Sequence, residues 1–245
     1  MKHVVPPLAL LLLAPLLAPL LAPGPVAAET GVVQDFDGRQ GVVNRVRAGA
    51  LDGAVQSGVN VLNVLEADRV GGLVGQTFPA TAGQDVLNVA QTRGAAAGID
   101  QSGVNIANLI SAGHVGAIAR VGDGRQTVTN VLRAGGPVSA VSQSGVNVVN
   151  YAEVATFGTI TQSADGRQRV SNILHARPGT GGIDLRQSGL NVANMVRLTS
   201  LAPAATTTIT QTGTADQSVR TVGPTGAAGR QNAVSVSNMV IIDVD

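Results

Sequence analysis

A block of residues repeated along the chain constrains the fold of this protein more than any other feature. The block reads QSGVNVLNVLEA from Gln56, QSGVNIANLISA from Gln101, QSGVNVVNYAEV from Gln143 and QSGLNVANMVRL from Gln187. Successive copies begin 45, 42 and 44 residues apart. A fixed period of this length is the signature of a repeat architecture, in which each unit packs only on its neighbours.

A second block alternates with the first. Its clearest members read GRQTVTNVLRA and GRQRVSNILHA, and an Asn again follows the Gln by four positions. A late form of this second block surrounds Gln231, and the QTG at Gln211 resembles a degenerate fifth copy of the first block. After the N-terminal segment, the chain therefore consists of about five double repeats, or about ten half-repeats of roughly 22 residues. The second block begins at Gln40, Gln84, Gln126 and Gln168.

The order of residue types inside the blocks predicts β-strands. From Gln168 to Ala176, the Val, Asn and Leu side chains share one face and the Arg, Ser and His side chains share the other. This two-residue alternation indicates a strand that is buried on one side. The QSG block at Gln101 is apolar on both faces, so we expect it to be covered on both sides. No helical stripe appears, and Val, Asn and Gly are poor helix formers.

Glycine-rich segments join the predicted strands. Asp-Gly pairs at 37–38, 123–124 and 165–166 precede the GRQ blocks, and we expect tight turns there in which glycine adopts a positive φ. Each half-repeat then forms a strand, a turn and a strand. Such a unit cannot bury its own apolar face and must stack on the next one. We therefore predict an all-β fold, a β-solenoid of about ten strand-turn-strand half-repeats with amyloid-like stacking.

The recurring amides predict self-assembly ladders inside this stack. Identical side chains in stacked strands lie about 4.8 Å apart, and each amide can then donate to one copy and accept from another. Inward amides would also set the register, because a slip of one residue turns every ladder outward. For Asn63 and Asn108, a role as simple turn residues remains open. We expect the ladders of the GRQ blocks on coils that alternate with those of the QSG blocks. The candidate ladder residues are Gln56, Asn60, Gln84, Asn88, Gln101, Asn105, Gln126, Asn130, Gln143, Asn147, Gln168, Asn172, Gln187 and Asn191.

Composition narrows the class of protein. Charged residues make up 13% of the chain, aromatic residues 2%, and cysteine is absent, which excludes a disulfide scaffold. Glycine has no three-residue period, which excludes collagen. Residues 29–245 contain 15 Arg and 15 acidic residues, so they are formally neutral and association is not opposed by charge. No basic block or aromatic platform suggests nucleic acid as a partner.

The N-terminus has the order of a secretory signal peptide. Lys2 and His3 precede an apolar run from Leu8 to Ala22, and small residues at 26–28 fit a cleavage site. We therefore predict a signal peptide at 1–28 and a mature repeat domain at 29–245, without a later transmembrane segment. The alternative is a retained membrane anchor. Prolines interrupt the apolar run, which is also shorter than the about 20 residues that a spanning helix needs.

The Gln-Ser-Gly-x-Asn blocks, above all those at 101–107 and 187–193, resemble the repeats of the curlin family of bacterial fibre subunits. The resemblance covers most of the chain from Phe36 to Asn238. It implies a β-solenoid subunit that polymerises outside the cell into an amyloid fibre for adhesion and biofilm matrix. It also implies an outer-membrane secretion pore and a nucleating minor subunit as partners. The chain departs from the family in its Gln-to-Asn spacing, which is four residues instead of five, and in its double period.

No arrangement of residues in the sequence predicts catalysis. His114 and His175 occupy non-equivalent positions in the repeat, where we expect solvated turn or outward strand residues. Without cysteine there is no thiolate nucleophile and no sulfur metal site. We therefore expect no catalytic residue, no cofactor and no metal. Arginines recur beside the predicted turns, where they are expected to pair with the turn aspartates; an alternative role is binding of acidic polysaccharide. These residues are Arg39, Arg125, Arg167 and Arg230.

Three functions compete at this point. The first is a secreted structural subunit, at the cell surface or outside the cell, that assembles with copies of itself into fibres. The second is a non-polymerising β-solenoid surface adhesin or carbohydrate-binding protein, whose ends would need caps; the strand from Val234 to Val244 could form one. The third is a β-helical polysaccharide-cleaving enzyme. That enzyme would need a non-repeated cluster of carboxylates, whereas the acidic residues here recur at turns.

Overall fold

The computed structural model describes residues 27–28, 31–176, 184–199, 208–223 and 229–243. Its regular structure in these residues is entirely β-strand. The predicted signal peptide lies outside the described residues except for Ala27 and Ala28, which pair with Arg69 and Val70. In the described part of the chain, no helix is of a length and apolarity that would let it cross a membrane.

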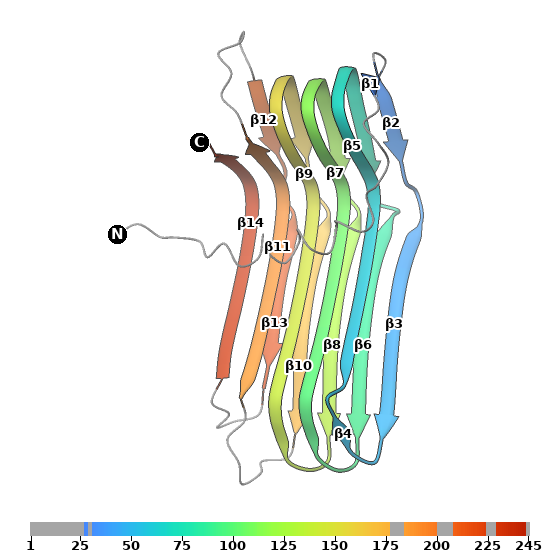
Figure 1. Ribbon diagram of the computed structural model, residues 1–245, viewed down its shortest axis with the longest axis vertical. Coiled ribbons are helices and arrows are strands. Elements are labelled where there is room, and N and C mark those ends of the chain that lie inside the picture. Colours follow the sequence, from blue (N-terminus) through green and yellow to red (C-terminus); the bar gives the residue numbers. More distant parts are fainter. Residues whose placement is uncertain (1–26, 29–30, 177–183, 200–207, 224–228, 244–245) are drawn as a thin grey trace, which may run out of the picture.

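The strands vary widely in length. Those that carry the QSG blocks are long and curved, whereas those that carry the GRQ blocks are straight and of equal length (Figure 1). The strands are β1 (Ala27–Ala28), β2 (Val32–Asp35), β3 (Arg39–Ala48), β4 (Leu51–Asp52), β5 (Val55–Phe78), β6 (Gly83–Thr92), β7 (Ala96–Gly122), β8 (Arg125–Ala134), β9 (Val138–Ser163), β10 (Arg167–Ala176), β11 (Leu185–Leu198), β12 (Thr208–Thr212), β13 (Asp216–Val222) and β14 (Gly229–Ile242).

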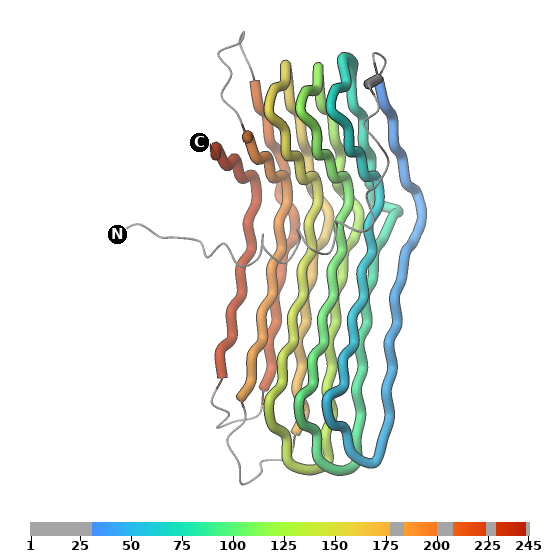
Figure 2. Tube along the Cα trace, in the orientation of Figure 1, coloured from blue at the N-terminus to red at the C-terminus, as the bar shows by residue number. Residues whose placement is uncertain are grey.

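Two parallel sheets stack these strands in register. The front sheet has the order β1-β5-β7-β9-β11-β14, with β2, β4 and β12 attached to it, and the back sheet has the order β13-β10-β8-β6-β3. In Figure 1 the two sheets lie face to face, and the trace in Figure 2 shows the coils repeating with the same outline. Every residue of the QSG block from Gln101 to Ala107 lies opposite its counterpart in the next copy. The architecture is a flattened β-solenoid, as predicted.

Two consecutive half-repeats form one coil. The strand β7 rises along the front, folds back on itself and is continued on the back by β8 (Figure 1). The fold-back is tight, because the Nδ2 atom of Asn108 donates to the carbonyl of Val121 at 2.8 Å. The QSG and GRQ blocks therefore face each other across the core. The expectation that their ladders occupy alternate coils of one stack is wrong, because each coil uses both half-repeats to enclose its core.

The two blocks interlock through a small residue and a large one. Gly103 of β7 faces the opposite sheet, where a Cβ atom would lie 2.5 Å from a Cγ1 atom of Val128 and 3.0 Å from one of Val86. The valines of the back sheet form a buried row into which the glycines of the QSG blocks fit. No side chain larger than hydrogen can occupy the glycine position without separating the sheets. The QSG glycine is therefore a packing residue rather than a turn residue.

Apolar clusters fill the rest of each coil. The upper part, where the long strands fold back, encloses Ile110, Val115 and Ile118 with their counterparts on neighbouring coils. The lower part, next to the bottom turns, encloses Ile99, Leu132 and their counterparts. On the outer face of the front sheet, Ile106 is 2% exposed and belongs to a further apolar row. Columns of Val, Leu and Ile thus supply a core that contains few aromatic rings.

The Asp-Gly pairs differ from the prediction. Positive φ occurs at Gly53, Gly98 and Gly213 among the described glycines and not at the glycines of the three Asp-Gly pairs. The pairs make short steps between strands that continue in the same direction, so the backbone does not reverse there. Asp123 caps such a step by accepting a hydrogen bond from the backbone N–H of Asp165 at 3.1 Å.

The arginines that follow these steps also have other partners than expected. Arg125 contacts Asp85 at 2.7 Å, and Arg167 contacts Asp216 at 3.1 Å, in each case across to a neighbouring strand of the back sheet. Both ion pairs are largely solvated, so they contribute little to stability. The predicted pairing with the turn aspartates is wrong for these two residues, because in-register stacking brings a carboxylate of the adjacent coil closer.

Ala140, in one column of equivalent residues of the front sheet, has a strained backbone conformation that a glycine would relieve. Gly53, Gly98 and Ala140 occupy equivalent places on successive coils with φ values of 63°, 59° and 48°. A left-handed conformation costs a residue with a side chain about 1–2 kcal/mol. We expect Ala140→Gly to raise the free energy of unfolding by about 1 kcal/mol, measured by urea denaturation. Ala134→Gly, in β8 and without positive φ, is the control and should lower it; a destabilised Ala140→Gly variant would contradict the strain.

Candidate self-assembly site

The predicted ladder residues line the narrow space between the two sheets. In each block, Gln and Asn are separated by four residues, which places both on the same face of a strand. In this structure that face is the inner one. Their exposed fractions range from 0% to 6%. The residues so placed are Gln56, Asn60, Gln84, Asn88, Gln101, Asn105, Gln126, Asn130, Gln143, Asn147, Gln168, Asn172, Gln187 and Asn191.

The glutamine side chains form two continuous rows, one on each sheet. In the front row, the Nε2 atom of Gln101 donates to Oε1 of Gln56 at 2.7 Å, and Gln143 donates to Gln101 at the same distance. In the back row, Gln126 donates to Gln84 at 2.8 Å. Every bond in these rows points from a later coil to an earlier one. The rows extend to Gln40, Gln217 and Gln231 at the ends of the stack.

The asparagine rows have the opposite polarity. Nδ2 of Asn60 donates to Oδ1 of Asn105 at 2.9 Å, and Asn105 donates to Asn147 at 2.9 Å. On the back sheet, Asn88 donates to Asn130 at 2.8 Å. All of these bonds point from an earlier coil to a later one. The dipoles of the Gln and Asn rows therefore run in opposite directions along the axis.

The second N–H of each amide joins the two sheets. Asn105 donates to the carbonyl of Thr127 at 3.0 Å, and Gln101 donates to that of Val131 at 3.1 Å. From the back sheet, Asn130 donates to the carbonyl of Ser144 at 2.7 Å. Burying an amide without hydrogen-bond partners costs free energy, and these bonds supply the partners that the polar core needs.

A third asparagine row lies where the front strands bend. Its members are left-handed, with φ between 51° and 58°, and Asn108 is completely buried. Asn108 donates to Oδ1 of Asn150 at 2.8 Å, again toward the later coil. These asparagines are both bend residues and ladder residues, so the choice left open by the sequence is resolved in favour of both roles. The signal was a second Asn three positions after the first in each QSG block. The row is Asn63, Asn108, Asn150, Asn194 and Asn238.

A further row, which sequence reasoning missed, contains a buried arginine. Gln34, Gln76, Gln162 and Gln211 occupy equivalent places, and Gln76 donates to Gln34 at 2.7 Å. The equivalent residue between Gln76 and Gln162 is Arg120, which is 2% exposed. The signal was a Gln six residues before Gln40 and before Gln168, and eight residues before Gln84. At this position the regular amide pattern is interrupted.

Arg120 satisfies its guanidinium with backbone carbonyls. Its Nη1 atom donates to the carbonyls of Asn108 and Tyr151, each at 2.6 Å. No carboxylate forms an ion pair with it among the described residues. Desolvation by burial lowers the pKa of Arg120 to about 9, well below the ordinary value of an arginine. The neighbouring Oε1 atom of Gln76 is buried and has no hydrogen-bond partner in the part of the chain described, since Arg120 supplies no amide in its direction.

The two ends of the solenoid differ from its middle in exposure. Gln231 and Asn238 of the last coil are exposed, whereas Gln187 and Asn194, one coil inside, are each 1% exposed. Most of the exposed large apolar residues also belong to the end coils, on β2, β3, β5 and β14. Both sheets end in an outermost strand, β3 or β13 on the back and β14 on the front. Such edges can pair with another strand.

Several polar groups lie outside the ladders. His114 is half-buried on β7 beside the hydroxyl of Thr156, at 2.9 Å, and His175 is exposed on β10. Within the described residues, no group of three or more His, Asp or Glu side chains is placed to hold a metal ion. Tyr151 donates to Glu153 at 2.8 Å, and desolvation together with that carboxylate raises the pKa of Tyr151.

No family model matches this chain, and no curated protein or solved structure matches it either.

Proposed function

We propose that this chain is a secreted structural subunit that stacks end to end with copies of itself into an extracellular, curli-type amyloid fibre. Adhesion and a biofilm matrix are the roles that such a fibre would serve. The observation that carries the proposal is the match between the two ends of the solenoid. The last described coil consists of β12, β13 and β14, and the first of β2, β3 and the start of β5, so that each end carries both sheets.

The polarity of the ladders supports stacking in one direction. At the end of the last coil, Asn238 has an Nδ2 group directed away from its own stack, because its Oδ1 atom accepts from Asn194. At the start of the first coil, Asn63 donates inward to Asn108, which leaves its Oδ1 atom toward the outside. If a second copy stacks on the last coil, the Nδ2 donor of Asn238 therefore meets the Oδ1 acceptor of Asn63 in that second copy. The same holds, with the roles exchanged, for Gln231 and Gln56.

Heterologous contacts of this kind do not close on themselves. Each copy uses one end surface to bind the opposite end surface of the next, so a stack of any length exposes the same two ends. The formal neutrality of residues 29–245 removes electrostatic repulsion between copies. A growing fibre is the expected product of such an interface.

The test uses a substitution that affects only the end of the ladder. In Asn238→Asp, the carboxylate still accepts the bond from Asn194 but can no longer donate to Asn63 of the next copy. It also places a charge in the interface, where desolvation is costly. We expect the rate of fibre elongation, followed by thioflavin fluorescence after dilution from denaturant, to fall at least about tenfold at pH 7.5.

The control is Asn232→Asp on the same strand. Asn232 is exposed and is equivalent to Ser188, which points outward, so the charge change is identical but lies on the outer face of the front sheet, away from the inward ladder. This variant should elongate at a rate within about twofold of the parent protein. Fibres of the parent protein should give reflections near 4.7 and 10 Å. A parent protein that stays monomeric for days, or equal rates in the two variants, would refute the proposal.

The partners proposed besides a second copy follow from the resemblance to curlins. They are an outer-membrane pore for secretion and a minor subunit that nucleates assembly.

The second candidate function is a non-polymerising surface adhesin. The contact between Arg197 and Asp243 at 2.6 Å favours it to some extent, because this ion pair ties the end of β14 back to the preceding coil. A monomer in the experiment above would select this alternative.

A further inference from the structure

A group of basic side chains lies on the outer face of the back sheet, near its bottom turns. In-register pairing aligns Arg47 with Gln91, Gln91 with Arg133, and Arg133 with His175 across four successive strands. Charges of one sign therefore occur on every second strand, about 10 Å apart, with an amide between them. This spacing avoids the repulsion of directly opposed like charges.

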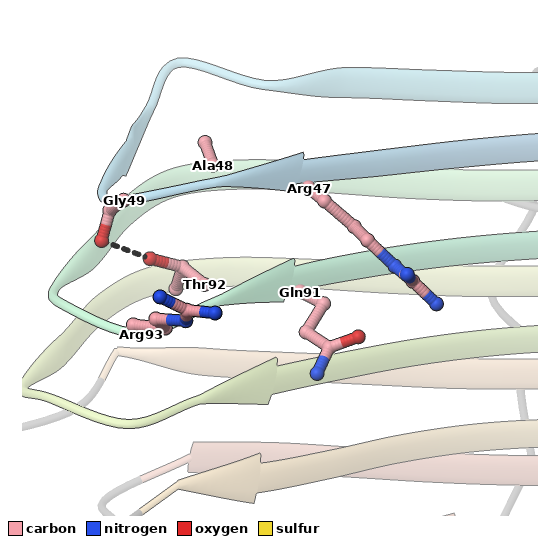
Figure 3. Close-up of a pocket in the computed structure, with 6 residues that line it drawn as sticks. All are labelled: Arg47, Ala48, Gly49, Gln91, Thr92 and Arg93. Atoms are coloured by element: carbon pink, nitrogen blue, oxygen red, sulfur yellow. Dashed lines mark hydrogen bonds between the residues drawn. The ribbon is translucent and has the colours of Figure 1, made fainter.

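The surface between these side chains is hollowed. Three adjoining hollows of about 340, 590 and 410 Å³ share Gln91 as a lining residue. Two of them also share Arg93, which lies in the turn after β6 (Figure 3), and two share Arg133. None of the three is lined by an acidic residue. We refer to this surface as the basic groove, whose basic lining residues are Arg45, Arg47, Arg93, Arg133 and His175.

The arginines of the groove differ from those higher on the same sheet. Arg125 and Arg167 each contact an aspartate of a neighbouring strand. Arg47, Arg93 and Arg133 form no ion pair with any described carboxylate. Guanidinium groups that are free of carboxylates and gathered around a hollow attract external anions, preferably planar or tetrahedral oxyanions that accept two hydrogen bonds.

The turn that carries Arg93 is held in place. The hydroxyl of Thr92 donates to the carbonyl of Gly49 at 2.7 Å (Figure 3) and accepts from the N–H of Gly94 at 3.1 Å. Thr92 is itself buried. Because the bond to Gly49 joins the turns of two successive coils, and the bond from Gly94 fixes the Thr92 hydroxyl within its own turn, the positions from which Arg47 and Arg93 extend are fixed relative to each other. The groove is in this respect preorganised.

We propose that the basic groove binds an acidic polysaccharide, with carboxylate or sulfate groups on the arginines and sugar hydroxyls on the amide of Gln91. The site lies on the side of the solenoid and not at its ends. It is therefore present on a single copy as well as on a fibre, and it does not depend on the proposed polymerisation. Its length over four strands suits a linear chain that runs along the solenoid axis.

Nucleic acid fits the groove less well. No aromatic residue lines the three hollows, so bases would find no surface on which to stack. Phosphates in one strand of B-form DNA are also separated by about 3.4 Å along the axis, much less than the spacing of the arginines. A polymer with sparser charges and many hydroxyl groups matches the groove better.

The experiment measures binding of the full chain, kept monomeric at low concentration, to fluorescently labelled alginate by anisotropy. We expect binding that weakens as NaCl is raised, because the contacts are electrostatic. The triple variant Arg47→Gln, Arg93→Gln, Arg133→Gln should bind at least about tenfold more weakly. The matched control is Arg125→Gln, Arg167→Gln, Arg186→Gln, which removes the same charge elsewhere and should lose less than about threefold.

Circular dichroism of both triple variants establishes that the sheets are retained, as expected for exposed side chains. If the groove variant fails to fold, Arg93→Gln alone, in the turn after β6, replaces it with an expected loss of about threefold. Equal losses in the two triple variants would overturn the proposal, since they would indicate attraction by net charge only. Equal binding of neutral dextran would overturn it as well. Single-stranded DNA that binds as tightly as alginate would assign the groove to nucleic acid instead.

Discussion

Asn105→Asp is expected to lower the free energy of unfolding by about 3–5 kcal/mol at pH 7.5, the usual effect of leaving a buried charge without a partner. Asn105 is completely buried and donates both to Asn147 at 2.9 Å and to the carbonyl of Thr127 at 3.0 Å. A carboxylate cannot donate either bond and would face two acceptors. For a domain of ordinary stability this loss removes a large share of the total. Urea denaturation followed by circular dichroism measures it.

The pH dependence distinguishes a buried carboxylate from a general packing defect. Burial raises the pKa of the new carboxyl group above the value of about 3.9 that it has in an unfolded chain. The folded variant then binds more protons than the unfolded one, so its deficit shrinks as the pH falls. Asn232→Asp, the exposed control, should change stability by less than about 0.5 kcal/mol. An Asn105→Asp variant as stable as this control at pH 7.5 would show that the ladder does not stabilise the fold.

Arg120→Gln is expected to stabilise the protein, by about 1–4 kcal/mol. The substitution restores the amide that the row of Gln34, Gln76, Gln162 and Gln211 contains on the other coils, and it supplies a donor for the buried Oε1 atom of Gln76. It also removes the desolvation of a cation that has no described carboxylate partner. Thermal or urea denaturation of the two proteins at pH 7.5 tests the expected increase.

Two comparisons make this prediction specific. Arg120→Ala removes the charge but leaves the carbonyls of Asn108 and Tyr151 without donors, so it should destabilise the protein. Because the folded-state pKa of Arg120 is lowered to about 9, the penalty of its charge is fully present below pH 9 and decreases as the pH rises above 9 toward the ordinary pKa of an arginine. The advantage of Arg120→Gln should therefore be smaller at pH 10.5 than at pH 8. Equal destabilisation by Gln and Ala would contradict the role assigned to the row.

The inward or outward direction of each side chain within a block could be predicted, because a strand places every second residue on the same face. For the block at Gln126, this rule puts Val128 and Asn130 inside and Thr127 and Arg133 outside, and the structure agrees. The rule is local and needs no knowledge of the partner strand. It therefore succeeds wherever a strand is straight.

The pairing of the blocks could not be predicted in the same way. Gly103 and Val128 interlock across the core, and nothing in either block alone specifies that contact. It depends on the left-handed conformation of Asn108, which bends the long strand so that the next half-repeat returns on the opposite face. A bend of this kind is a property of three-dimensional packing, and a turn or a straight strand was equally compatible with the spacing.

The sequence by itself determined that the chain stacks as a parallel β-solenoid with inward rows of Gln and Asn, because identical blocks at a regular period can satisfy their amides only on one another. Only the tertiary structure decided that two half-repeats share one coil and that Gln and Asn rows run in opposite directions. It also placed Arg120 inside the core and left Arg47 and Arg133 without carboxylate partners among the described residues. The physical reason is that these features depend on which backbone carbonyls and side chains meet across the core, and such long-range contacts are set by the curvature of the strands.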